Sequence, residues 1–174
     1  MNPLVSRVGE RVRAVRRTRG LSLTALAEAA AIGKGSLSEL ENGVRNPTLA
    51  TLYALAAPLG VPLATLLDDA AGAVVTDDGV SVVLLETRRS ASSVREVYAL
   101  DLDPGAVRTS PAHGSGVVEH LLVTSGSLEA GRVGAGAALA AGEHHTWTSD
   151  VEHVYRAGPR GAGAVLTILT GSPS

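Results

Sequence analysis

The sequence predicts two domains, an all-α domain of five short helices followed by an all-β domain built as an antiparallel double-sheet sandwich or barrel. Residues 1–67 carry apolar side chains at helical spacing between glycine stops. Residues 79–174 hold short β-branched runs separated by turn signals. Residues 68–78, which begin with small and acidic side chains, are expected to form the linker between the two domains.

The charge of the chain changes at the same border. Residues 1–67 hold eight Lys and Arg against four Glu, a net charge of +4. Residues 68–174 hold seven basic and thirteen acidic residues, a net charge of −6, and all five His. A basic first domain favours a polyanionic partner.

The composition narrows the class of protein. Of the 174 residues, 45% are hydrophobic but only 2% are aromatic, so the cores must consist of Leu, Val and Ala. The lack of Cys excludes a disulfide scaffold and cysteine-ligated zinc, and it fits a reducing compartment. No apolar run approaches the roughly 20 residues of a membrane span, and charge interrupts MNPLVSRVGERVR before a signal peptide forms. We expect a soluble cytoplasmic protein without a membrane partner.

Each helix of the first domain has a start or stop signal. The first helix is expected between Asn2-Pro3 and Gly20. Ser22 and Thr48 are placed to cap the second and fourth helices. The other expected boundaries are a third helix over residues 34–41 ended by Asn42-Gly43, and Gly60 before a fifth helix over residues 62–67.

The stretch LSLTALAEAAAIGKGSLSELENGVRNPTLATLYALAAPLGV resembles the helix-turn-helix of phage-repressor-type (XRE) transcription factors. The features that agree are Leu26-Ala27, Ile32-Gly33, Ser36-Leu37-Ser38, Glu41-Asn42-Gly43 and Arg45-Asn46-Pro47-Thr48. The resemblance covers nearly all of residues 6–67. It implies a transcriptional regulator that binds a double-stranded DNA operator as a homodimer.

In such domains the second helix of the motif presents its N-terminal residues to base edges in the major groove. The residues at those positions are Lys34, Gly35, Ser36 and Ser38, with Glu39 one turn further on. Lys34 suits the acceptors of guanine and Glu39 suits the amine of cytosine. The resemblance also implies phosphate contacts for Thr24, Ser36, Asn42, Arg45 and Asn46. Asn42 is equally placed as a helix C-cap, and we interpret most arginines of the first helix as solubilising charge.

The second domain resembles a cupin, a small double-sheet β-barrel, over roughly residues 94–170. The strands are expected at residues 80–85, 94–100, 117–123, 128–133 and 165–169. The first cupin motif is matched by Gly105, His113, Glu119 and Gly126, and the second by Gly136, Leu139 to Glu143 and His153. The sequence departs from the family in two ways. Pro111 stands where the family often has a His, and five residues separate His113 from Glu119, which is slightly more than usual.

A cupin metal centre typically has three His and one Glu, a donor set for Fe, Mn, Ni, Zn or Cu. This chain offers His113, Glu119 and His153 as ligands and lacks the fourth. Because strand side chains alternate, a Glu119 that points inward turns His120 outward. By the same rule only one of His144 and His145 faces inward, as the one evident replacement ligand.

Three interpretations of this cluster remain open. It forms a metal-free effector pocket, a site for a divalent transition metal, or part of a domain that only packs or dimerises. The pocket would be lined by His113, Glu119, His145, Trp147, His153 and Tyr155. The favoured function is a transcriptional regulator whose barrel binds a small-molecule effector, with no enzymatic activity. The alternative is a metal-dependent cupin enzyme of dioxygenase or isomerase type fused to a DNA-binding head; a third hypothesis is an antitoxin-like protein that grips a protein partner.

Overall fold

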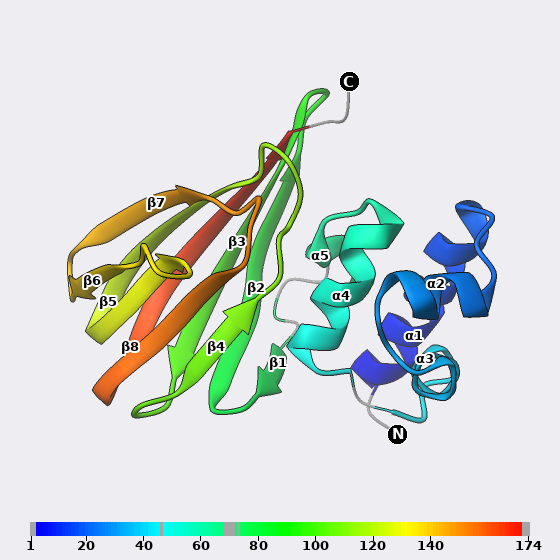
Figure 1. Cartoon of the computed structure of the whole chain (residues 1–174), viewed down its shortest axis with the longest axis horizontal. Coiled ribbons are helices and arrows are strands. Elements are labelled where there is room, and N and C mark those ends of the chain that lie inside the picture. Colours follow the sequence, from blue (N-terminus) through cyan, green and yellow to red (C-terminus); the bar gives the residue numbers. More distant parts are fainter. Residues whose placement is uncertain (1–2, 46, 68–71, 73, 172–174) are drawn as a thin grey trace. The chain divides into compact units, whose positions relative to one another are not determined.

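The computed structural model describes residues 3–45, 47–67, 72 and 74–171. The chain divides into two compact units, Met1–Ala70 and Ala71–Ser174, which Figure 1 shows as a helical part and a sheet part. Residues 74–77, which the sequence places in the linker, form the first strand of the sheet. Residues 68–71 and 73 of that expected linker lie outside the described residues.

The first unit contains five described helices, and the predicted signals mark their ends. Ser22 accepts a hydrogen bond from the backbone N–H of Ala25, and Thr48 does the same for Thr51, so both predicted caps are confirmed. Gly60 takes the left-handed conformation, with φ 62°, at the end of the fourth helix. The helices are α1 (Pro3–Thr18), α2 (Leu23–Ala29), α3 (Lys34–Glu41), α4 (Leu49–Leu59) and α5 (Leu63–Leu66).

A leucine-rich core holds these helices together. Its most deeply buried side chains include Val12, Leu26, Leu37, Leu40, Leu52, Leu55, Leu59 and Leu66. The helices α1 and α3 approach closely at Gly9, where a Cβ atom would lie 2.2 Å from the carbonyl oxygen of Leu40. The backbone of α1 therefore rests directly on the end of α3, which fixes the helix that carries the predicted DNA contacts.

The second unit is one antiparallel sheet of eight strands. They are β1 (Val74–Asp77), β2 (Val80–Arg89), β3 (Ser93–Leu102), β4 (Val107–Ser110), β5 (Val118–Arg132), β6 (Ala137–Ala140), β7 (His144–Thr148) and β8 (His153–Gly171). The strand order is β1-β2-β3-β8-β5-β6, with β4 paired to β8 and β7 paired to β5. Among the described strands this path has two free ends, so the sheet is not closed into a barrel. The predicted class of a helical domain followed by a cupin-like all-β domain is confirmed.

Strands β5 and β8 are long and bent. Register shifts interrupt their pairing between Val123 and Ser125 and between Gly126 and Leu128. Gly126 has φ +69°, and a Cβ atom there would lie 2.1 Å from the carbonyl oxygen of Gly161. The sequence predicts two separate strands here, over residues 117–123 and 128–133. That prediction is wrong, because the glycine bends one continuous strand against β8.

Within the described residues, none of the helices combines the length and the apolar character that crossing a bilayer demands.

Candidate functional site

The first candidate site is the N-terminal turn of α3. Lys34, Gly35 and Glu39 are exposed and Ser36 and Ser38 are half-buried, whereas Leu37 and Leu40 are buried on the opposite face. A Cβ atom at Gly35 would meet nothing within 4 Å, so the backbone is open on this side. The structure therefore leaves the five predicted base-reading residues exposed or half-exposed over the first two turns of α3.

The predicted phosphate-binding residues lie on three different segments of the domain. Thr24 on α2, Asn42 at the C-cap of α3 and Arg45 beyond it are exposed. Arg45 also pairs with Glu39, with Nη1 of Arg45 3.5 Å from Oε2 of Glu39. Asn46 lies outside the described residues. The pair means that Glu39, which the sequence offers to cytosine, already has a partner in the free protein.

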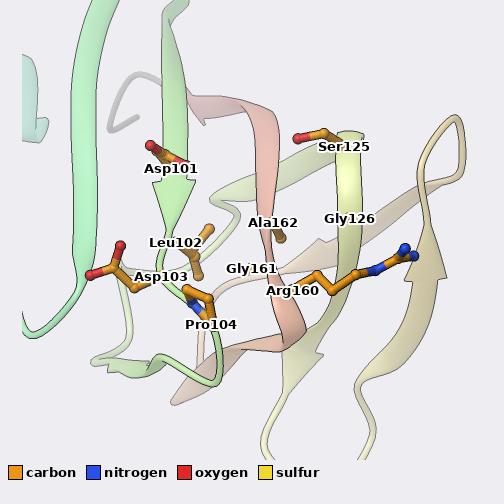
Figure 2. Close-up of a pocket in the computed structure, with 9 residues that line it drawn as sticks. All are labelled: Asp101, Leu102, Asp103, Pro104, Ser125, Gly126, Arg160, Gly161 and Ala162. Carbon is orange, nitrogen blue, oxygen red and sulfur yellow. The ribbon is translucent and has the colours of Figure 1, made fainter.

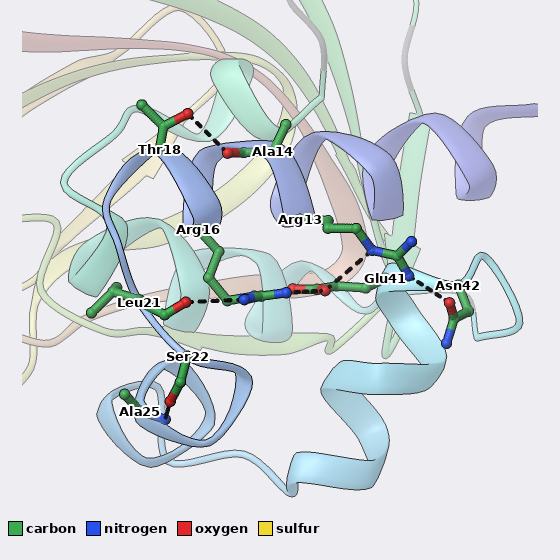
Figure 3. Close-up of polar contacts among 9 residues, drawn as sticks. All are labelled: Arg13, Ala14, Arg16, Thr18, Leu21, Ser22, Ala25, Glu41 and Asn42. Carbon is green, nitrogen blue, oxygen red and sulfur yellow. Dashed lines mark hydrogen bonds and ion pairs between the residues drawn. The ribbon is translucent and has the colours of Figure 1, made fainter.

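The arginines of α1 do more than the sequence suggests. Arg16 donates from Nε and Nη2 to the two carboxylate oxygens of Glu41, at 2.6 and 2.7 Å, and from Nη1 to the carbonyl oxygen of Leu21, at 3.0 Å (Figure 3). Burial lowers the pKa of Arg16, but the hydrogen bond to Glu41 outweighs it and raises that pKa. Arg13 donates to Glu41 as well, and Arg11 donates to the carbonyl oxygen of Thr65. The interpretation of most of these arginines as solubilising charge is therefore wrong.

Glu41 is the residue that sequence reasoning missed in this domain. Its side chain is 3% exposed. The signal was present, because Glu41 follows Leu37 by four residues and so lies on the buried face of α3. Arg13 also donates to Oδ1 of Asn42 (Figure 3). That bond orients the Asn42 side chain and leaves its amide NH₂ to donate elsewhere.

The second candidate site is a buried cluster in the sheet domain. His113 follows β4, Glu119 lies on β5 and His153 begins β8. Nε2 of each histidine lies 3.1 Å from Oε1 of Glu119. Tyr155 on β8 donates its hydroxyl to Oε2 of the same carboxylate. The possible ligand atoms of the three residues lie within 4.8 Å of one another, close enough to share one metal ion.

The tautomer of His153 is set by the backbone. Its Nδ1 lies 3.1 Å from the carbonyl oxygen of Val151, and because a carbonyl only accepts, Nδ1 carries the proton. In the neutral ring, the lone pair of Nε2 then faces Oε1 of Glu119, and neither atom makes a hydrogen bond to a described residue. Two lone pairs at this distance repel each other unless a proton or a cation lies between them. Metal-ligating histidines have this same support from a backbone carbonyl.

The charges of the cluster favour a bound cation. Burial opposes the ionisation of Glu119, but the two imidazoles outweigh it and lower the pKa of Glu119 to about 2. Burial lowers the pKa of His113. For His153, burial acts in the same direction but the neighbouring Glu119 outweighs it and raises the pKa. The cluster thus holds an ionised carboxylate that attracts positive charge, either a proton on His153 or a metal ion that displaces it.

Aromatic rings continue the site on β7. Trp147 is buried, and His145 stacks on it with ring centroids 5.5 Å apart. Trp147 also contacts Tyr155, with centroids 5.9 Å apart. His145 does not belong to the group of possible metal ligands among the described residues, so the structure does not supply the replacement fourth ligand there. His120 and His144 are exposed, as strand alternation predicts.

Arg108 was not identified from the sequence. It lies on β4 with its side chain turned inward, and its Nε donates to Oγ of Ser110 at 3.2 Å. Its charge acts to lower the pKa of both His113 and His153. Arg108 and Ser110 alternate with exposed neighbours on β4, and no pattern in the sequence marks this short strand as one with a buried face.

Comparisons with known proteins agree with both halves of the chain. A family model described as Helix-turn-helix matches residues 12–66. The HTH-type transcriptional regulator SutR of Escherichia coli K12 is 32% identical over 148 residues, which cover 83% of each chain. The crystal structure of an HTH_3 family transcriptional regulator from Vibrio cholerae has the same fold, with a TM-score of 0.84 at 24% identity over 98% of both chains. A Cupin_2 domain of an XRE family regulator from Enterobacter cloacae is 31% identical, covers 42% of this chain and 79% of its own, and has a TM-score of 0.40.

Proposed function

The chain belongs to the XRE-type helix-turn-helix transcriptional regulators with a cupin-like second domain, and from this premise we propose that it reads a DNA operator with α3 and responds to a small-molecule effector bound in its sheet domain. One observation carries the proposal. The N-terminal turn of α3 is accessible, whereas Leu37 and Leu40 on the opposite face of the same helix are buried in the core. Regulators of this kind bind two-fold operators as dimers, so the functional species is a homodimer.

On the DNA, Lys34 donates to guanine acceptors in the major groove, while Thr24, Asn42 and Arg45 bind the backbone. The ion pair between Glu39 and Arg45 does not oppose this arrangement. Both side chains are more than half exposed, and an exposed pair contributes at most about 1 kcal/mol. Breaking the pair between Glu39 and Arg45 to form contacts with DNA therefore costs little free energy.

A divalent transition metal fits the buried cluster in the sheet domain. The fit rests on the His153 tautomer, which aims a lone pair at the ionised Glu119, and on a donor set of two imidazoles and one carboxylate. His113, Glu119 and His153 would hold the metal, which supplies a Lewis-acidic position for a ligand donor atom. Tyr155 fixes the orientation of Glu119, and the stacked rings of His145 and Trp147 form a wall beside the site.

The effector acts by binding one arrangement of the dimer more tightly than another. A ligand shifts such an equilibrium only through its differential affinity for the two states. The buried cluster supports this role, because it gathers one carboxylate and two imidazoles that offer donor and acceptor atoms to a ligand. A metal-dependent enzyme is the second candidate, because two His and one carboxylate are also the ligands of non-haem iron oxygenases.

Selection of genomic DNA fragments by the full-length protein tests the proposal. We expect enriched fragments with a two-fold sequence, bound at least about 10³-fold more tightly than random DNA at physiological salt. The affinity for the enriched site is then measured before and after treatment with a chelator. Selected fragments that bind no more tightly than random DNA would contradict the proposed regulator. Turnover of a substrate by the metal-loaded protein would favour the enzyme.

A further inference from the structure

One row of side chains on the outward face of the sheet is apolar across five strands. The strand registers place the residues of this row directly beside one another. They are Val74 on β1, Val83 on β2, Ala99 on β3, Val165 on β8 and Leu122 on β5. At about 4.8 Å between strands, the row is roughly 19 Å long.

This apolar row is accessible and its neighbours extend it. Val74 is 47% exposed and Leu122 is 44% exposed. Leu85, at the bulge of β2, is 46% exposed, and Val97 lies on the outward face of β3. The residues that flank them in sequence, such as Tyr98 and Leu121, are buried on the other face. A contiguous apolar patch on an otherwise polar surface marks an interaction site.

The two ends of the same face carry opposite charge. At one end, Arg88 and Arg95 are register partners on this face, and Glu86 offsets only part of their positive charge. At the other end lie Asp78, Asp101 and Asp103. Figure 2 shows Asp101 and Asp103 where β3 ends, with the side chain of Arg160 extending away from both. The face is therefore polarised along the strands, with the apolar row between the two ends.

We propose that a second copy of this chain covers this face, with the two-fold axis of the dimer lying along the apolar row. Such an axis packs the row of one copy on the same row of the other and reverses the strand direction. Arg95 lies four residues before Ala99 and Asp103 lies four residues after it, so the axis brings Arg95 of one copy opposite Asp103 of the other. Face-to-face sheets pack about 10 Å apart with nearly aligned strands, which suits this arrangement.

The charges favour a two-fold axis along the apolar row over a two-fold axis along the strands. A two-fold axis along the strands would place the arginine ends of the two copies together, and like charges at an interface oppose association. An axis along the row pairs opposite charges twice, as an isologous interface requires. The inference deepens the proposed function by giving the homodimer its interface, but its test does not involve DNA.

Sedimentation analysis of the full-length protein tests the interface. We expect a dimer for the wild type and at least a tenfold weaker dimer for Leu122→Glu, which puts a charge in the row. The matched control is Val107→Glu, because Val107 is also 44% exposed but lies on β4, away from the row. A monomeric wild type, or equal dimerisation by the two variants, would overturn the proposal.

A charge exchange tests the orientation of the two copies. Arg95→Asp and Asp103→Arg should each weaken the dimer, and the double variant should recover most of the lost affinity. A double variant that dimerises more weakly than both single variants would overturn the proposed two-fold axis along the row. Thermal melts of all variants establish that they fold. An intact dimer that selects no DNA would contradict the proposed regulator and leave this interface standing.

Discussion

Arg16 and Glu41 form a bidentate ion pair that joins α1 to the last turn of α3, with nitrogen to oxygen distances of 2.6 and 2.7 Å. The side chain of Glu41 is almost fully buried, and Arg16 also binds the carbonyl oxygen ahead of α2. One guanidinium group thereby holds three helices of the motif in place.

Removing the carboxylate should therefore destabilise the helical domain strongly. Glu41→Ala leaves a largely buried guanidinium group without its partner, and breaking a buried pair typically costs about 3 kcal/mol or more. We expect this loss in the free energy of unfolding, measured by denaturant titration of the helical circular dichroism signal. Glu39→Ala is the control, because Glu39 is on the same helix and its pair with Arg45 is exposed. Equal losses in the two variants would contradict the structural role of Glu41.

A second prediction concerns the bend of β5. Gly126→Ala places a methyl group against the carbonyl oxygen of Gly161 and forces a left-handed residue. We expect a loss of about 3 kcal/mol or more in stability of the sheet domain, since the strain of the backbone alone accounts for only about 1–2 kcal/mol. Gly134→Ala isolates that strain, because Gly134 has φ +79° and open space around it. A Gly126 variant no less stable than the Gly134 variant would show that the close approach is not essential.

A third prediction concerns metal binding. Protein purified without chelators or affinity nickel should contain about one equivalent of a divalent transition metal. His153→Ala should lose it, because the ring supplies the lone pair that faces Glu119. His120→Ala should keep it, since His120 is exposed on the same sheet. Elemental analysis distinguishes the cases, and equal metal content in both variants would show that the metal binds elsewhere.

A fourth prediction concerns the support of the metal ligands. Tyr155→Phe removes the hydroxyl that donates to Glu119 and keeps the ring that packs on Trp147. Losing such a partner typically weakens metal affinity by about 10–100-fold. Competition with a fluorescent chelator measures this change. An unchanged affinity would mean that Tyr155 only packs.

Local chemistry in the sequence predicts much of this fold. Ser22, Thr48 and Gly60 mark helix ends because capping depends only on neighbouring residues. Strand alternation also predicts that Glu119 and His120 lie on opposite faces, and the structure has Glu119 buried and His120 exposed. The resemblance to helix-turn-helix transcriptional regulators is confirmed by a relative of the chain and by the matching family model.

The features that the sequence does not reveal depend on distant partners. Ser125-Gly126 has the composition of a turn, and only the approach of Gly161 shows that β5 continues through it. Arg16 finds Glu41 25 residues further along the chain. Arg108 appears solvated in the sequence, and its inward direction depends on the pairing of β4 with β8.

The binding of the selected operator and of random DNA at physiological salt, by wild type and by Lys34→Ala, tests the central claim most directly. The account predicts a wild-type preference of at least about 10³-fold. The Lys34 variant should lose about 1–3 kcal/mol of that preference, while Arg17→Ala, which changes an exposed arginine of α1, should keep it. A wild type that binds both DNAs equally, or a preference unchanged by Lys34→Ala, would contradict the reading of DNA by α3.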